Sequence, residues 1–67
     1  MTMTKKIKMK RMLNDLTQKD MAGKLGVHIG TYSKKENGLI AWSIEDVKKL
    51  RKILNLSDEE IIDIFFK

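Results

Sequence analysis

The spacing of apolar and polar residues along the chain predicts short amphipathic helices and no β-strands. Apolar residues recur at the three- and four-residue intervals of a helix, no strict alternation persists, and proline is absent. We expect a first helix over about 5–13, a second that begins after Thr17, a third over about 28–37, a fourth that begins after Ser43 and a fifth that begins after Ser57. The predicted fold class is therefore all-α, a compact bundle of five short helices.

Capping residues mark the boundaries of these helices. The second, fourth and fifth each begin with Thr or Ser followed three residues later by an acidic residue, which is the capping-box signature. The three pairs are Thr17 and Asp20, Ser43 and Asp46, and Ser57 and Glu60. Gly26 and Gly38 follow the second and third helices, at positions where a positive φ turns the chain out of a helix.

The inward positions of the helices predict the core. Met21, Ala22 and Leu25 form one apolar stripe on the second helix, and Tyr32 points away from the exposed residues of the third. Trp42 is expected to close the core. The other inward candidates are Ile7, Met12 or Leu13, Leu16, Ile44, Val47, Leu50, Leu54 and part of the apolar run 61–66.

The length of 67 residues predicts one small domain, 1–67, whose first four residues we expect to be loose. Domains of this size bury only about 60% of their unfolded surface, and without cysteine neither a disulfide nor a thiolate metal site adds stability. A modest core or a partner chain must then suffice. We expect a cytoplasmic protein, because no apolar run approaches the ~20 residues of a membrane span and no apolar segment follows the basic start as in a signal peptide.

The net charge of +5 is unevenly distributed. Residues 1–14 carry five basic residues and no acidic one, 15–38 carry four against three, and 39–67 carry five against six. The positive field therefore lies in the first half of the chain, where it attracts polyanions, usually nucleic acid. A charged surface that only keeps the protein soluble explains the composition equally well.

The segment from Leu16 to Gly38 carries the most specific signal, two short helices separated by a glycine turn. Its ordered residues are Leu16-Thr17-Gln18, Met21-Ala22, Lys24-Leu25-Gly26-Val27, Thr31, Ser33-Lys34 and Glu36-Asn37-Gly38. In these residues the chain resembles the Cro/repressor-type (XRE-like) helix-turn-helix family of phage and bacterial transcriptional regulators, with weaker similarity from Ile7 through Arg11 and from Ser43 to about Ile61. The resemblance implies a lambda-repressor-like fold with the helix-turn-helix at about 17–37 and the third helix in the major groove of DNA.

The resemblance also implies the DNA-binding residues. Gln18 matches a glutamine that meets the DNA backbone, while Ile29, Gly30 and Lys34 match the positions that read base edges. The full expected set is Gln18, His28, Ile29, Gly30, Thr31, Ser33, Lys34, Lys35 and Asn37. Arg11 and Glu36 match a structural pair that forms a salt bridge between the first helix and the end of the third.

Four positions depart from the family pattern. Ile29 and Gly30 stand where relatives carry polar side chains, so Lys34 remains as the expected contact to guanine O6 and N7, with Thr31 at a phosphate or a thymine methyl. Lys35 replaces a commonly apolar residue, which either weakens packing or lets its stem snorkel outward. His28 stands where Ser or Thr usually caps the recognition helix.

These features predict a double-stranded DNA-binding transcriptional repressor that acts as a homodimer through the apolar segment 61–66. One alternative is a protein-binding antirepressor or modulator of another regulator, motivated by Ile29 and Gly30. A second is an antitoxin-like component, which ranks lower because it needs a further segment beyond residue 67. No catalytic set, glycine-rich phosphate loop or metal-ligand set can be assembled, His28 being the single histidine, so we expect no enzyme, no metal and no cofactor.

Overall fold

The computed structural model describes residues 3–66. Within that range the chain forms five helices and no strand, with bounds α1 Met3–Leu13, α2 Gln18–Leu25, α3 Ile29–Glu36, α4 Ile44–Ile53 and α5 Asp58–Phe65. The predicted all-α fold class is confirmed. Residues 3 and 4 lie in α1, although we expected the segment 1–4 to be loose, and residues 1 and 2 lie outside the described residues.

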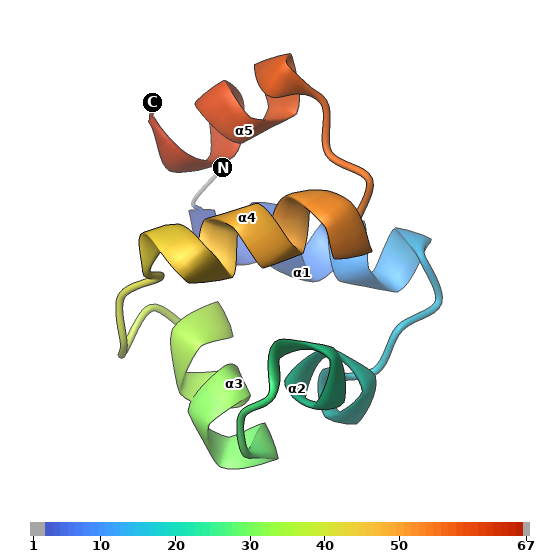
Figure 1. The fold of residues 1–67 in the computed structure, drawn as a ribbon, viewed down its shortest axis with the longest axis vertical. Coiled ribbons are helices and arrows are strands. Elements are labelled where there is room, and N and C mark those ends of the chain that lie inside the picture. Colours follow the sequence, from blue (N-terminus) through green and yellow to red (C-terminus); the bar gives the residue numbers. More distant parts are fainter. Residues whose placement is uncertain (1–2, 67) are drawn as a thin grey trace.

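The two helices joined by the glycine turn lie together at one end of the molecule. Figure 1 shows α2 and α3 at this end, α5 at the other, and α1 and α4 between them. α2 packs on α3 and contacts α4, whereas α1 contacts both α3 and α5. α3 is therefore held in the bundle by its contacts with α2 and α1. None of the helices within residues 3–66 is long and apolar enough to cross a membrane.

All three predicted capping boxes are present. In each, the Thr or Ser hydroxyl accepts a hydrogen bond from the backbone N–H three residues later, and the acidic side chain there accepts one from the capping residue's own N–H. Gly26 and Gly38 adopt positive φ angles of 71° and 81°, as predicted. These local interactions satisfy helix-end groups and fix where α2, α4 and α5 begin.

The core lies where the five helices meet. Its buried residues are Ile7, Met21, Ala22, Leu25, Tyr32, Leu50, Leu54, Leu56 and Ile64, with Leu16, Val27, Trp42, Ile53, Ile61 and Phe65 packed against them. Most of the predicted inward positions are therefore confirmed, including the stripe on α2. Val47 is half-buried.

The expectation that Met12 or Leu13 faces inward is wrong, because these side chains are 58% and 73% exposed. The inward line of α1 runs from Ile7 to Arg11, one helical turn later. The two residues after Arg11 are rotated from that line by about 100° and 200°, so they point outward.

The expectation for Ile44 is also wrong, because its side chain is 77% exposed. The inward line of α4 runs through Asp46, Leu50 and Leu54, which are spaced four residues apart and are all buried. Ile44 lies on nearly the opposite side of the helix from Asp46, since two residues correspond to about 200° of rotation.

Candidate nucleic-acid interface

The connection between α2 and α3 is short and fixed by hydrogen bonds. Gly26 adopts the left-handed conformation at the end of α2, and its N–H donates to the carbonyls of Ala22 and Gly23. The N–H of Val27 donates to the Ala22 carbonyl at 3.0 Å, and α3 begins at Ile29. Because residues 26–28 are the whole connection, the angle between α2 and α3 has little freedom.

One side of α3 is left exposed, and we call it the outer face; it consists of Ile29, Gly30, Ser33 and Lys34. These positions are two i, i+4 pairs and therefore lie on one side of the helix. Ile29, Gly30 and Lys34 are exposed and Ser33 is half-buried, whereas Tyr32 on the opposite side is completely buried. The structure thus brings four of the predicted DNA-binding residues together on a single surface.

Three other predicted residues lie at the margins of the outer face. Thr31 is half-buried and lies on the side of α3 next to the outer face. His28 is the exposed N-cap residue of α3, and its side chain makes no capping hydrogen bond. Asn37 is the exposed residue that ends α3, and its amide donates to the Ser33 hydroxyl at 3.3 Å. The surface therefore extends along the whole length of α3.

Lys35 is not part of this surface. Its side chain is 13% exposed, and its ammonium group forms an ion pair with the Asp46 carboxylate at the beginning of α4. The ammonium also lies 6.0 Å from the centroid of the Trp42 ring. The predicted alternatives for Lys35 were weak packing or an outward stem, but the structure directs its charge inward to an acidic partner.

Behind the outer face, Glu36 receives hydrogen bonds from three directions. Its carboxylate, only 2% exposed, accepts from Arg11 Nε at 2.9 Å and Arg11 Nη2 at 3.2 Å, which makes the pair bidentate. The Tyr32 hydroxyl donates to it at 2.5 Å and the Gln18 amide at 3.3 Å. Arg11 also donates to the Leu16 carbonyl at 2.8 Å. The Arg11–Glu36 pair thus joins α1, α2 and α3 at one point.

The charges in this network are stable at neutral pH. Burial alone raises the pKa of the Glu36 carboxyl, but the hydrogen bonds from Arg11, Tyr32 and Gln18 outweigh it and hold the pKa below its usual value. Burial and the hydrogen bond to Glu36 raise the pKa of the Tyr32 hydroxyl, so it stays protonated and donates. The hydrogen bond to Glu36 likewise raises the pKa of Arg11.

Gln18 lies between this network and the surface. It is the first residue of α2, is half-buried, and directs one amide N–H to Glu36 Oε1. The other amide N–H group is available at the N-terminus of α2, where the helix dipole favours an anion. The predicted role of Gln18 at the DNA backbone is compatible with this position.

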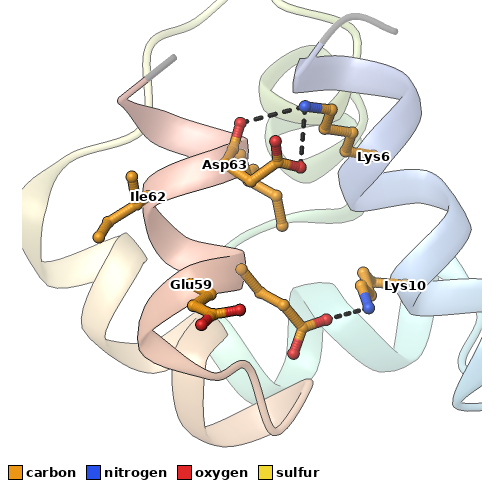
Figure 2. A pocket seen from close by; sticks show the side chains of 7 residues that line it. Lys6, Lys10, Glu59, Ile62 and Asp63 are labelled. Atoms are coloured by element: carbon orange, nitrogen blue, oxygen red, sulfur yellow. Dashed lines mark hydrogen bonds and ion pairs between the residues drawn. The ribbon is translucent and has the colours of Figure 1, made fainter.

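Part of the basic N-terminal charge is neutralised within the molecule. Lys6 Nζ lies 3.0 Å from the Asp63 carboxylate and donates to the Asp63 carbonyl at 3.1 Å, and Lys10 pairs with Glu60 (Figure 2). The hydrogen bond from Lys10 lowers the pKa of Glu60 to about 2. These pairs line a hollow of about 480 Å³ between α1 and α5. They hold α5 on α1 (Figure 2), at the end of the bundle away from α2 and α3 (Figure 1).

Sequence reasoning missed two residues that support this surface, Tyr32 as a hydrogen-bond donor and Asp46 as an ionic partner. The four-residue spacing of Tyr32 and Glu36 places them on one helix face, so that contact had a local signal. Lys35 and Asp46 are eleven residues apart across a loop, and no helical spacing indicates their contact.

A family model described as "Helix-turn-helix" matches residues 7–61. The match includes all of α2, α3 and α4, the connection at Gly26, and both members of the Arg11–Glu36 pair. Comparisons with curated proteins and with solved structures find no match. Among residues 3–66, no group of three or more His, Cys, Asp or Glu side chains is placed to hold a metal ion.

Proposed function

Because the chain belongs to the Cro/repressor-type (XRE-like) helix-turn-helix family of DNA-binding transcriptional regulators, we propose that it represses transcription by binding a specific duplex sequence as a homodimer. One observation carries this proposal: the outer face of α3 is exposed, while the opposite side of the helix is fixed by the Glu36 network. A rigid helix with an exposed side suits insertion into the major groove.

We propose a role for each residue of the outer face. Lys34 reaches guanine O6 and N7, the acceptors that a lysine reads most readily. Ile29, with half of its side chain exposed, meets a thymine methyl, and Thr31 meets a phosphate or a second methyl. Gly30 has no side chain, so it lets the helix backbone approach the bases closely. Selectivity therefore depends chiefly on Lys34.

Phosphate contacts set the register of α3 on the duplex. Gln18 at the start of α2 and Asn37 at the end of α3 carry amide groups that can donate to phosphate oxygens. His28 and Ser33 add polar groups along the same surface. Lys35 is left out of the contact set because its ammonium is paired with Asp46.

The homodimer surface is narrower than the run 61–66. Ile64 is buried in its own domain, and Ile61 and Phe65 pack against the core. Ile62 and Phe66 remain 50% and 74% exposed, and Phe66 lines an apolar groove of about 370 Å³ between α4 and α5. Two copies joined here are proposed to place their α3 helices in successive major grooves, about 34 Å apart.

Selection of bound sequences from a random duplex library near 0.15 M salt tests the function, with Lys34→Ala as the variant and Lys52→Ala as the control. Lys52 is exposed in the last turn of α4. We expect a two-fold-related motif that is lost or relaxed in Lys34→Ala only. If each dimer neutralises about six phosphates, log affinity falls with log salt at a slope near −5. A slope shallower than about −2 contradicts the proposal.

Sedimentation tests the dimer separately. Phe66→Ser is expected to weaken self-association, whereas Leu13→Ser, at a residue with nearly equal exposure on α1, is expected to leave it unchanged. A wild-type protein that stays monomeric at tens of micromolar, with and without the selected duplex, contradicts the homodimer.

A second candidate function is supported by the apolar character of part of the surface. Ile29 and Leu39 are 52% and 76% exposed, and Gly30 offers no polar group. Such a surface suits contact with another regulator, as in an antirepressor or modulator. Failure of the folded wild-type protein to enrich any duplex, together with capture of a defined regulator, favours this second function.

A further inference from the structure

Lys35 and Lys34 are adjacent in α3 but have opposite surroundings. Lys34 is exposed on the outer face, whereas the ammonium of Lys35 is held by the Asp46 carboxylate, with side-chain exposures of 13% and 10%. We propose that Lys35 is a positioning residue that ties α3 to the start of α4 and thereby sets the orientation in which α3 presents Lys34 to DNA. This inference rests on the proposed DNA-binding function.

Asp46 is a fixed point for this tie. The carboxylate oxygen that receives Lys35 also accepts the Ser43 backbone N–H at 3.0 Å, and the Asp46 N–H donates to the Ser43 hydroxyl at 3.1 Å. The carboxylate is therefore part of the capping box of α4. Burial alone raises its pKa, but the hydrogen bonds from Lys35 and Ser43 hold the pKa below its usual value. A cation bound here is therefore bound to the first turn of α4.

The last turn of α3 is consequently held on two sides by neighbouring residues. Glu36 joins it to Arg11 of α1 at 2.9 Å, and Lys35 joins it to Asp46 of α4. The first turn has no comparable attachment through its N-cap, since the His28 side chain makes no capping hydrogen bond. The direction of α3 therefore depends both on the short connection to α2 at its start and on these two attachments of its last turn, where Lys34 lies.

Trp42 fills the space beside the tie. Its ring lies 6.0 Å from the Lys35 ammonium and meets the Tyr32 ring edge-on, with 6.0 Å between the centroids. Tyr32 in turn donates to Glu36. Both attachments thus share one packed set of aromatic side chains, which opposes independent movement of either one.

A direct contact between Lys35 and DNA conflicts with this arrangement. To reach a phosphate, the ammonium must leave Asp46, and the carboxylate then remains close to the surface without its cation. Lys34 needs no such rearrangement, because it is already exposed on the outer face. The two lysines therefore differ in role: one binds DNA and the other aligns the helix.

The test compares Lys35→Met, Asp46→Asn and their double variant with Lys34→Met, the same substitution at the adjacent position. Binding to the duplex selected by the wild-type protein and to a random duplex is measured at several salt concentrations, at equal concentrations of folded protein. Lys35→Met and Asp46→Asn are each expected to lower the ratio of selected to random affinity about tenfold, and the double variant no further. Their salt slopes stay at the wild-type value, whereas Lys34→Met reduces the slope by about one.

Loss of folded protein alone would lower binding to both duplexes and leave the ratio unchanged, so the ratio separates positioning from stability. A wild-type ratio in folded Lys35→Met overturns the inference, as does a slope reduced by about one, which marks a direct phosphate contact. If Lys35→Met does not fold, Asp46→Asn decides, because it removes the negative charge that pairs with Lys35 while the Asn oxygen can still accept the Ser43 N–H. A wild-type protein that enriches no duplex refutes the proposed function instead, and the slopes on random duplex still show whether Lys35 contacts phosphate.

Discussion

Replacement of Glu36 by Gln tests whether the buried network fixes α3. The substitution keeps the size of the side chain but removes its charge and turns one of its two acceptor oxygens into a donor. In the wild-type protein each carboxylate oxygen accepts two hydrogen bonds. Oε2 accepts from Arg11 Nε and the Tyr32 hydroxyl, and Oε1 accepts from Arg11 Nη2 and the Gln18 amide. Whichever way the new amide turns, its NH₂ group faces two donors.

The size of the expected loss of stability follows from the burial of the Arg11–Glu36 pair. The Arg11 and Glu36 side chains are 10% and 2% exposed, so the guanidinium stays buried without its anion in Glu36→Gln. Removal of one partner from a buried pair costs about 3–5 kcal/mol. A chain of 67 residues has a total stability of about 3–10 kcal/mol at roughly 0.05–0.15 kcal/mol per residue. The variant is therefore expected to lose about 30% of its stability or more, and its melting temperature to fall by at least about 12 °C.

Urea unfolding followed by circular dichroism measures this loss at neutral pH. The control is Glu45→Gln, the same chemical change at an exposed residue in the first turn of α4, which is expected to stay within about 0.5 kcal/mol of the wild type. A free energy of unfolding of Glu36→Gln within about 1 kcal/mol of the wild-type value would refute the reasoning. The network would then contribute no more to stability than one surface contact.

Two further predictions concern stability. The acidic groups whose pKa the fold lowers are Asp20, Glu36, Asp46 and Glu60, the last to about 2. At low pH the folded state binds fewer protons than the unfolded state, so the stabilisation by these groups is complete above their ordinary pKa values of 3.8 and 4.5 and is lost as pH falls towards 2. Thermal unfolding measured across this pH range should show the loss. A melting temperature that does not change with pH contradicts the prediction. Gly26→Ala is expected to destabilise by about 1–2 kcal/mol because φ is 71° there, whereas Gly30→Ala, whose added Cβ meets nothing within 4 Å, should stabilise by about 0.4–1 kcal/mol. Equal effects of the two substitutions in urea unfolding would contradict the assigned geometry.

The fold could be predicted from the sequence where its causes are local. A capping box needs only the residue at the cap and the one three positions later, so the starts of α2, α4 and α5 followed directly from Thr17, Ser43 and Ser57. The turn at Gly26 needs one residue that tolerates positive φ. Periodicity failed where a polar residue occupies the inward line, as Arg11 does in α1 and Asp46 does in α4, because hydrophobic spacing carries no sign of a buried ion pair.

The surface that we assign to DNA could be predicted only in part. Lys34 and Lys35 are the same residue type at adjacent positions, and a basic pair on a recognition helix predicts two DNA contacts. Which of them is available depends on rotation about the helix axis and on an acidic partner eleven residues away. Lys35 and Asp46 meet only after the loop between α3 and α4 has brought the start of α4 back to the last turn of α3, so the difference between the two lysines is tertiary.

The same distinction limits the positive charge that can serve DNA. In the first fourteen residues, Lys6, Lys10 and Arg11 are each paired with an acidic residue of α5 or α3. With Lys35 also paired, these cations already neutralise a carboxylate, so they are expected to neutralise few phosphates and to add little to the salt slope. A salt slope near −5 must then come mainly from exposed groups around α2 and α3, and substitution of Lys34 should reduce it more than substitution of Lys6. The asymmetry of charge along the chain therefore indicates how the bundle is held together as much as what it attracts.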